Sequence, residues 1–290
     1  MTRPVYRFAP SPNGLLHLGH AYSALLNRDL AEANHGRLLL RIDDVDLERC
    51  RPEFPAAIEE DCTWIGLDYE RPVRHQQEHL NLYASALDKL REMGLAYPAF
   101  MSRTQVTQFV AQTGPADDWP RDPDGSLRYP GHDREMDAKE RDSRLSSNEP
   151  HAIRLAMNKS IAAVGPVSWR EFQAGETGRS TSEIAEPSTW GDILLAGRDI
   201  AASYHLAVVV DDDQQGVTHV VRGVDLRAAT SVHRLLQKLL GLREPRYHHH
   251  RLILDAEGRK LSKTDGDSGI AALRERGWSV ADIREAIGLA

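Results

Sequence analysis

The order of the elements predicted near the N-terminus limits how this chain folds more than any other feature. Residues 5–9 are strand-like, residues 18–34 repeat apolar side chains at helical spacing, and residues 38–42 are strand-like again. Two strands joined through a helix lie parallel, because the helix carries the chain back across the sheet. The sequence therefore predicts an α/β fold, in which a parallel sheet has helices on both faces.

The same alternation of strands and helices returns later in the chain. Further helices are expected at residues 52–66, 78–91, 230–240 and 279–287, and further strands at residues 204–210, 218–222 and 251–254. The run from Asp211 to Asp213 is expected to form the turn that ends the strand at 204–210.

A middle region interrupts this alternation. Residues 98–189 have a different character, and residues 113–150 within them are rich in Pro, Gly, Asp and Arg. We expect residues 98–189 to be an inserted α+β subdomain with a long, partly mobile loop at 113–150. The insertion then divides a Rossmann-like domain into residues 1–97 and residues 190–290.

Composition places the chain among ordinary globular proteins. It has 290 residues, a formal net charge of −7 and two cysteines, Cys50 and Cys62, which are too few for a disulfide framework. The charge by itself does not indicate a nucleic-acid partner, because such binding depends on local basic patches. No apolar run approaches the roughly 18 residues of a membrane span. We expect a monomeric cytoplasmic protein.

The turn after the first strand carries the first candidate site. It contains Ser11 and Asn13, followed by His17, Gly19 and His20. The first strand-to-helix turn of a parallel sheet is a common phosphate site, because helix N–H groups point out of it. Each histidine can donate a hydrogen bond to a phosphate oxygen whose charge grows during a reaction. The alternative is a histidine-containing helix cap without catalytic function.

A second candidate site lies near the other end of the chain. Lys260-Leu261-Ser262-Lys263 follows a strand-like run and a glycine-containing turn. Two lysines and a hydroxyl on a loop can neutralise a triphosphate and its leaving pyrophosphate. A solvated basic loop is the alternative for this motif alone, but finding both motifs in this order favours an ATP site.

Longer segments around both motifs resemble the glutamyl branch of the class I aminoacyl-tRNA synthetases. They are residues 7–14, 16–20, 40–46, 207–212, 216–223 and 260–263, and the resemblance covers about residues 5–110 and 188–265. Within that branch, Arg222-Gly223-Val224-Asp225-Leu226 is similar to a truncated group of paralogues without an anticodon-binding domain. The 27 residues that follow Lys263 (290 − 263) agree with an expected absence of that domain.

The resemblance implies that the Rossmann-like domain is catalytic and that residues 98–189 form its acceptor-side insertion. It also implies a reaction. The truncated paralogues use ATP with Mg²⁺ to activate glutamate, and they transfer it to the queuosine base in the anticodon of tRNA(Asp). Three alternatives stay open at this point. The chain could charge a tRNA 3′ end, bind nucleotide or tRNA as a regulatory paralogue, or act as a nucleotidyltransferase on a small acceptor.

The resemblance also implies roles for individual residues. Those matching glutamate-binding positions are Arg7, Ala9, Ser11, Asp43, Tyr204 and Arg222. Those matching ATP-binding positions are Pro12, His17, Gly19, His20, Asp225, Ser262 and Lys263, and the catalytic ones are His17, His20, Lys260 and Lys263. A guanidinium such as that of Arg222 suits this role physically, because it clasps a carboxylate through two donors and rejects a neutral amide.

One substrate position departs from the family pattern. The family usually has Glu where Asp43 stands, and that carboxylate pairs with the substrate ammonium. Asp keeps the charge but is one methylene shorter, so glutamate must sit deeper or a water must bridge. Asp44 is the alternative partner if the loop shifts register.

A second departure concerns metal binding. Many family members hold a structural zinc in the insertion through cysteines and a tyrosine, and the matching positions here are Ala99, Met101, Tyr129 and Asp133. Ala and Met cannot replace thiolates as zinc ligands. Packing by Phe100 and Trp119 is expected to replace the metal.

We therefore predict that the purified protein contains no zinc. Elemental analysis of the native, unchelated protein is the measurement. Stoichiometric zinc that survives gel filtration would contradict this prediction.

Overall fold

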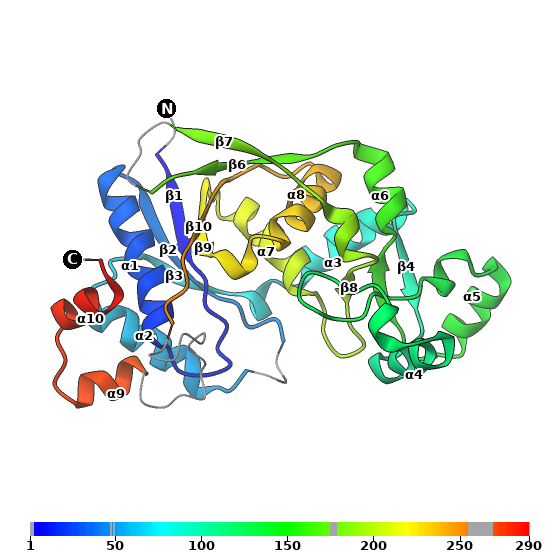
Figure 1. Ribbon diagram of the computed structural model, residues 1–290, viewed down its shortest axis with the longest axis horizontal. Coiled ribbons are helices and arrows are strands. Elements are labelled where there is room, and N and C mark those ends of the chain that lie inside the picture. The colour runs from blue at the N-terminus through cyan, green and yellow to red at the C-terminus, as the bar shows by residue number, and fades with distance from the viewer. Residues whose placement is uncertain (1–2, 47, 49, 175–178, 255–268, 290) are drawn as a thin grey trace.

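A parallel three-stranded sheet forms the first part of the fold, as predicted. The computed structural model describes residues 3–46, 48, 50–174, 179–254 and 269–289. The strands are β1 (Val5–Phe8), β2 (Arg37–Ile42) and β3 (Glu70–His75), and they lie in the order β1-β2-β3. Both pairs are parallel, and β2 is the central strand because it pairs with β1 and with β3. The helices α1 (Leu18–Ala33) and α2 (Glu53–Trp64) belong to the connections between these strands (Figure 1).

A second, mixed sheet continues the first beyond β1. It has the order β7-β6-β10-β9, formed by β6 (Ser168–Phe172), β7 (Ser180–Ile184), β9 (His219–Gly223) and β10 (Arg246–His250). β9, β10 and β6 are parallel, and β7 is antiparallel to β6. β9 lies next to β1, where the Thr218 N–H donates to the Val5 carbonyl at 3.0 Å. The two sheets therefore act as one platform.

A third sheet lies in the lobe opposite the N- and C-terminal ends of the chain (Figure 1). It is antiparallel and is formed by β4 (Ala96–Ala99), β5 (Ala152–Leu155) and β8 (Leu194–Ala196). Around it are α4 (Arg103–Thr113), α5 (Ala138–Ser146), α6 (Met157–Val164) and the 3₁₀ turns Ala116–Asp118, His132–Glu135 and Pro187–Trp190. β6 leads from this lobe into the second sheet, and the antiparallel β7 leads back toward the lobe.

Strands within the predicted insertion therefore belong to two different sheets. Within residues 98–189, the end of β4 pairs with β5 in the lobe. β6 and β7 instead belong to the second sheet, beyond β10. The predicted division at residues 98 and 189 stays a prediction. The predicted long loop at 113–150 contains one regular helix, α5, which Asp137 caps by accepting a hydrogen bond from the Lys139 N–H at 2.8 Å.

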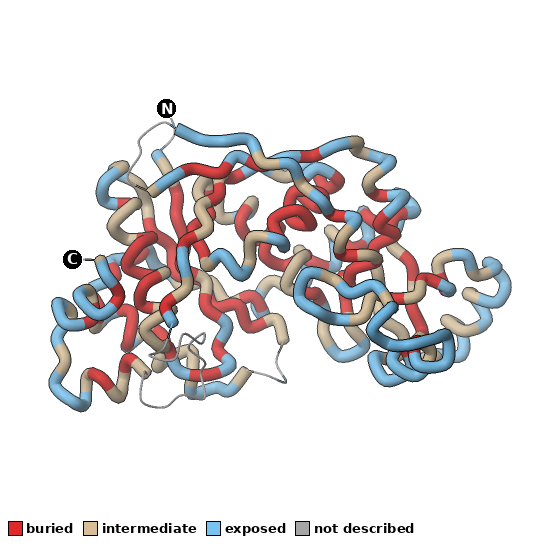
Figure 2. The backbone as a smooth tube through the Cα atoms, viewed as in Figure 1, coloured by how far each residue is buried: buried red, intermediate tan, exposed pale blue. Residues whose placement is uncertain are grey.

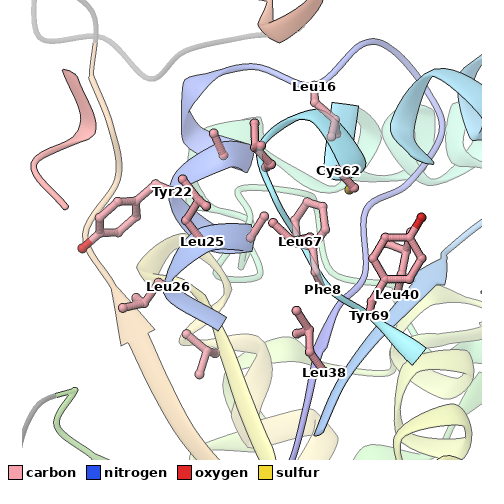
Figure 3. Packing of buried hydrophobic residues seen from close by; sticks show 14 of the residues in the cluster. Phe8, Leu16, Tyr22, Leu25, Leu26, Leu38, Leu40, Cys62, Leu67 and Tyr69 are labelled. Atoms are coloured by element: carbon pink, nitrogen blue, oxygen red, sulfur yellow. The ribbon is translucent and has the colours of Figure 1, made fainter. Parts of the chain in front are cut away.

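The main core lies between α1 and the parallel sheet. Leu25 of α1 and Phe8 and Leu40 of the strands are buried there and are labelled in Figure 3. Burial follows this layer and the neighbouring helices, while α4 and α5 are largely exposed (Figure 2). A second cluster packs the helices α3 (Leu80–Glu92), α7 (Tyr204–Gln214) and α8 (Ala229–Leu240) together.

The C-terminal helices close the core from the side of α1 and α2. They are α9 (Ile270–Glu275) and α10 (Val280–Ile287). The Ile270 N–H donates to the Leu16 carbonyl at 2.9 Å, and Arg284 pairs with Asp29 of α1 at 3.0 Å. The segment after the predicted Lys-Leu-Ser-Lys loop is thus attached directly ahead of His17. Within the described residues, no helix is long and apolar enough to cross a membrane.

The prediction of a strand at residues 204–210 is wrong. These residues form the helix α7, and the Ser203 side chain caps it by accepting a hydrogen bond from the Leu206 N–H. The run Val208–Val210 is β-branched, which favours strands, but the helix is buried around most of its circumference and packing decides its conformation. The predicted turn Asp211–Asp213 is accordingly helical.

The predicted strand at residues 251–254 is misplaced. The strand is β10 (Arg246–His250), and it pairs with β9 from Arg246↔His219 to His250↔Gly223. Its three histidines lack the apolar character by which buried strands are found in sequence. His248 bonds the Phe172 carbonyl of β6 and His249 bonds the Glu171 side chain, and local sequence does not reveal these partners.

Asp61 generates a prediction about stability. It is buried in α2 with one carboxylate oxygen lacking a hydrogen-bond partner, and burial raises its pKa to about 6 although Arg274 opposes this at 3.9 Å. A raised pKa means that the folded protein loses stability as pH rises from about 4 to about 6, because the unfolded Asp ionises first.

We therefore expect Asp61→Asn to be more stable than the wild type above pH 6, by about 1 kcal/mol once Arg274 and solvent screening are considered. The advantage should shrink toward pH 4. Urea unfolding at pH 7.5 and pH 4.5 measures this, with Asp68→Asn at an exposed position as the control. Equal stabilisation at both pH values would contradict the assignment.

Candidate active site

A cavity of about 780 Å³ lies at the carboxyl ends of β1, β2, β9 and β10. Its wall contains Phe8 at the end of β1, Asp43 after β2, Gly223 at the end of β9 and His250 at the end of β10. This edge is where open parallel sheets bind their ligands. The site residues predicted from sequence that line it are Arg7, Ala9, Ser11, Asp43, His17, Gly19, His20, Tyr204, Arg222 and Asp225.

The first-turn histidines are oriented by the helix they begin. His17 is the N-cap of α1, and its Nδ1 accepts from the Gly19 N–H at 3.1 Å. His20 Nδ1 accepts from the His17 N–H at 3.2 Å, which completes a capping box. Because Nδ1 of each ring is an acceptor, the proton of each neutral ring sits on Nε2. In each of these histidines, Nδ1 therefore accepts a capping hydrogen bond and Nε2 is the donor.

Gly19 is required by the His17 ring. A Cβ at this position would lie 2.9 Å from His17 Cε1 and 3.1 Å from His17 Nδ1. Any larger residue would push the ring away from the helix N-terminus. The ring beside this glycine is that of His17, and its centroid lies 3.9 Å from the centroid of the His20 ring.

A guanidinium forms another part of the cavity wall. Arg222 in β9 is 5% exposed, and its Nη1 lies 3.3 Å from the Tyr204 hydroxyl. Thr230 and His233 of α8 accept from it at 2.7 and 3.1 Å. This fixed positive group, reached through the cavity, suits a substrate carboxylate.

A buried network of charged side chains supports a third part of the cavity wall. Arg41 is completely buried and donates to Asp43 at 2.7 Å and to Asp212 of α7 at 2.7 Å. Arg7 donates to the same Asp212 at 3.1 Å. Burial raises the pKa of Asp43 to about 6, although Arg41 and Arg7 oppose this. Asp43 is therefore a carboxylate above about pH 6, where it can accept from an ammonium.

Two other predicted positions that the structure describes, Asp44 and Pro12, do not line the cavity. Asp44 does not line the cavity, because its carboxylate is held by His75 and by the Gln77 N–H, both at 3.0 Å. It therefore anchors the end of β3 and does not replace Asp43. Pro12 is likewise absent from the cavity wall. Lys260, Ser262 and Lys263 lie outside the described residues.

The positions that match the family's zinc ligands do not fit a zinc ion. The Tyr129 hydroxyl donates to the Asp133 carboxylate, which also accepts from the Phe100 N–H at 3.1 Å. Ala99 and Met101 contribute no thiolate, so only one anionic side chain is present. Among the residues that the structure describes, no cluster of three or more metal-binding side chains occurs. Trp119 also packs near this network, 5.8 Å from Phe109 by ring centroids.

Several residues that support the site were not identified from the sequence. Thr230, His233 and Gln237 lie on one buried face of α8, and His249 and Glu171 lie on neighbouring strands. The available signal is the spacing in α8, where polar residues recur three and four apart on a face that a buried helix would normally make apolar. Glu171 gives no local signal.

Known proteins share both the sequence and the fold of this chain. The model of the family "tRNA synthetases class I (E and Q), catalytic domain" matches residues 5–289. The glutamyl-Q tRNA(Asp) synthetase of Rhodobacter capsulatus is 43% identical over 98% of this chain and 100% of its own length. The glutamate–tRNA ligase of Coprothermobacter proteolyticus is 35% identical over 94% of this chain, which spans 55% of that ligase.

A solved structure shows the same relation. The glutamate-tRNA synthetase from Elizabethkingia anophelis superposes with a TM-score of 0.76 at 28% identity. The match covers 92% of this chain and 54% of the synthetase, so the chain spans about half the length of the glutamate–tRNA ligases it resembles.

The close contact at Gly19 predicts the effect of a single methyl group. Gly19→Ala should displace the His17 ring and weaken ATP binding about tenfold, as expected for an overpacked site. Titration calorimetry with a non-hydrolysable ATP analogue measures the affinity. Gly114→Ala, at a glycine with open space around it, is the control. An unchanged affinity in Gly19→Ala would remove the His17 orientation from nucleotide binding.

Proposed function

Since the chain belongs to the class I tRNA synthetases of the E and Q type, we propose that it activates glutamate with ATP and transfers it to the queuosine base in the anticodon of tRNA(Asp). One observation carries the proposal. The wall of a single cavity includes both the His17–His20 turn and the Arg222 guanidinium. The match to the whole length of the Rhodobacter capsulatus relative supports the choice of acceptor.

We assign the first step to the cavity wall. The α-carboxylate of glutamate attacks the α-phosphorus of ATP, a glutamyl-adenylate forms, and pyrophosphate leaves. His17 and His20 donate from Nε2 to phosphate oxygens, whose negative charge increases in the transition state. Lys260 and Lys263 are proposed to meet the leaving pyrophosphate, and Mg²⁺ is proposed to neutralise the phosphates of bound ATP.

Substrate selection is assigned to the charged groups. Arg222 and Tyr204 bind the side-chain carboxylate of glutamate, and Asp43 accepts from its ammonium group. Asp43 shares its carboxylate with Arg41, so it stays in place rather than extending toward solvent. Arg7 is held by Asp212 and lines the same wall. The Asp43 side chain is shorter than that of the Glu usual at this position in the family. The substrate glutamate must therefore sit deeper in the cavity.

The second step releases AMP. A nucleophile on the acceptor base attacks the carbonyl carbon of the adenylate, and the phosphate oxygen departs with AMP. Charging of a tRNA 3′ end is the second candidate, since the glutamate–tRNA ligases are 31–35% identical to this chain. The two candidates share the first step and differ only in the acceptor.

The proposal predicts two measurements in sequence. Without tRNA, the protein should catalyse ATP–pyrophosphate exchange that depends on glutamate and not on glutamine, because Arg222 requires a carboxylate. Labelled glutamate should then pass to queuosine-containing tRNA(Asp) from which the 3′-terminal adenosine has been removed.

The unmodified tRNA(Asp) of the same sequence is the matched control, and it should accept no label. Absence of exchange with every acidic amino acid would overturn glutamate activation. Transfer that requires the 3′-terminal adenosine, and not queuosine, would replace the proposed acceptor by the tRNA 3′ end.

A further inference from the structure

The side chains that hold Arg222 are all uncharged. Its guanidinium donates to Thr230 Oγ1 at 2.7 Å, His233 Nδ1 at 3.1 Å, the Tyr204 hydroxyl at 3.3 Å and His249 Nε2 at 3.4 Å. Within the described part of the chain, no carboxylate oxygen lies within 4.0 Å of this guanidinium. Arg222 is therefore oriented without being neutralised, and its charge stays available to a ligand.

The hydrogens of one branch of this shell are fixed by chemistry. A guanidinium only donates, so His233 Nδ1 carries no proton and His233 Nε2 carries one. That Nε2–H then donates to His205 Nδ1 at 3.2 Å. Burial lowers the pKa of both histidines, that of His205 to about 4, and the nearby Arg222 charge acts in the same direction. Both rings are neutral at pH 7.

The second branch reaches a carboxylate. Thr230 Oγ1 accepts from Arg222, so its own hydrogen points to His249 Nε2 at 3.0 Å. His249 must then carry its proton on Nδ1, which donates to Glu171 at 2.9 Å. Glu171 also accepts from the His249 backbone N–H at 2.8 Å and from Trp169 Nε1 at 2.9 Å. Burial opposes ionisation of Glu171, but these hydrogen bonds hold its pKa below the usual range.

Arg222 and Tyr204, which both line the cavity, each keep one donor that these contacts do not use. The four contacts occupy four of the five N–H groups of Arg222 and leave one on Nη2. Tyr204 accepts from Arg222, so its hydroxyl hydrogen is free to point to another acceptor, and Tyr204 lines the cavity. A carboxylate entering there meets two donors, one from each residue. A change in the proton on His249 would disturb this arrangement, because a hydrogen on Nε2 would face Thr230 and Arg222.

We propose that Glu171 is a positioning residue for amino-acid specificity: through His249 and Thr230 it fixes the donors of Arg222 that bind the substrate carboxylate. This role rests on the proposed activation of glutamate. Glu171 lies on β6, within the stretch predicted as an insertion, and pairs with β10 at Tyr247. The segment between the two catalytic halves therefore contributes to the amino-acid pocket itself.

The test uses Glu171→Gln in the full chain. The new amide can donate to His249 Nδ1, which moves the ring proton to Nε2 and reverses the relay toward Arg222. In ATP–pyrophosphate exchange, we expect the KM for glutamate to rise about tenfold. The KM for ATP and kcat should stay within about twofold of the wild type, because the His17–His20 end of the cavity is unchanged.

A matched control and a spectroscopic measurement accompany this variant. Glu183→Gln removes the same charge from the adjacent strand β7, where Glu183 pairs with Arg227 at 2.8 Å, and it should leave all three constants unchanged. Nitrogen-15 NMR of the His249 ring should show the proton on Nδ1 in the wild type and on Nε2 in Glu171→Gln. If Glu171→Gln does not fold, Thr230→Val breaks the same relay without changing β6 and should raise the KM for glutamate alike.

The outcomes separate this proposal from the proposed function. A wild type that lacks glutamate-dependent exchange overturns the function. A wild type that exchanges, together with an unchanged KM for glutamate in Glu171→Gln, overturns the role of Glu171. A rise in both KM values together with a fall in kcat and Tm also overturns it, because such changes assign Glu171 to folding alone.

Discussion

The burial of Arg41 is the constraint on which the rest of the structure depends. A fully desolvated guanidinium is tolerated only with opposite charges and hydrogen bonds around it, and Arg41 obtains them from Asp43 and from Asp212 of α7. Asp212 also holds Arg7 of β1, so two strands and one helix are joined at a single carboxylate. The neighbouring Asp211 is held by Arg74, Gln76 and Tyr83. The part of the cavity proposed to bind the amino acid is built directly on this network.

The same network explains which parts of the fold were predictable from sequence. The turn from β1 to α1 is local, because the cap of α1 uses only His17, Gly19 and His20, and its pattern can be read within a few residues. The helix α7 is not local. Its valines favour a strand, but a helix turns Asp211 and Asp212 toward two different groups of partners, and those partners are 128 to 205 residues away in the sequence.

The candidate site divides in the same way. Arg7, Asp43 and Arg222 could be proposed from sequence because each stands in a motif of recognisable length, and Tyr204 lies just before another; all four line the cavity. The shell around Arg222 could not, since it combines a polar face of α8 with a single glutamate from a strand 78 residues before its partner. The position of Pro12 off the wall and the attachment of Asp44 to His75 likewise depend on loop geometry, which residue identity does not specify.

The pairing of β6 with β10 also sets the order in which the chain can assemble as it leaves the ribosome. The strands β1, β2 and β3 can meet as soon as the first part of the chain has emerged. β6 has no parallel neighbour until β10 has been made, and Val5 receives its bonds from Thr218 only after 213 further residues. Such distant pairings are slow to form and leave strand edges uncovered in the meantime. The pocket proposed for the amino acid is therefore among the last parts of the nascent protein to be completed, after the local turn proposed to begin the nucleotide site.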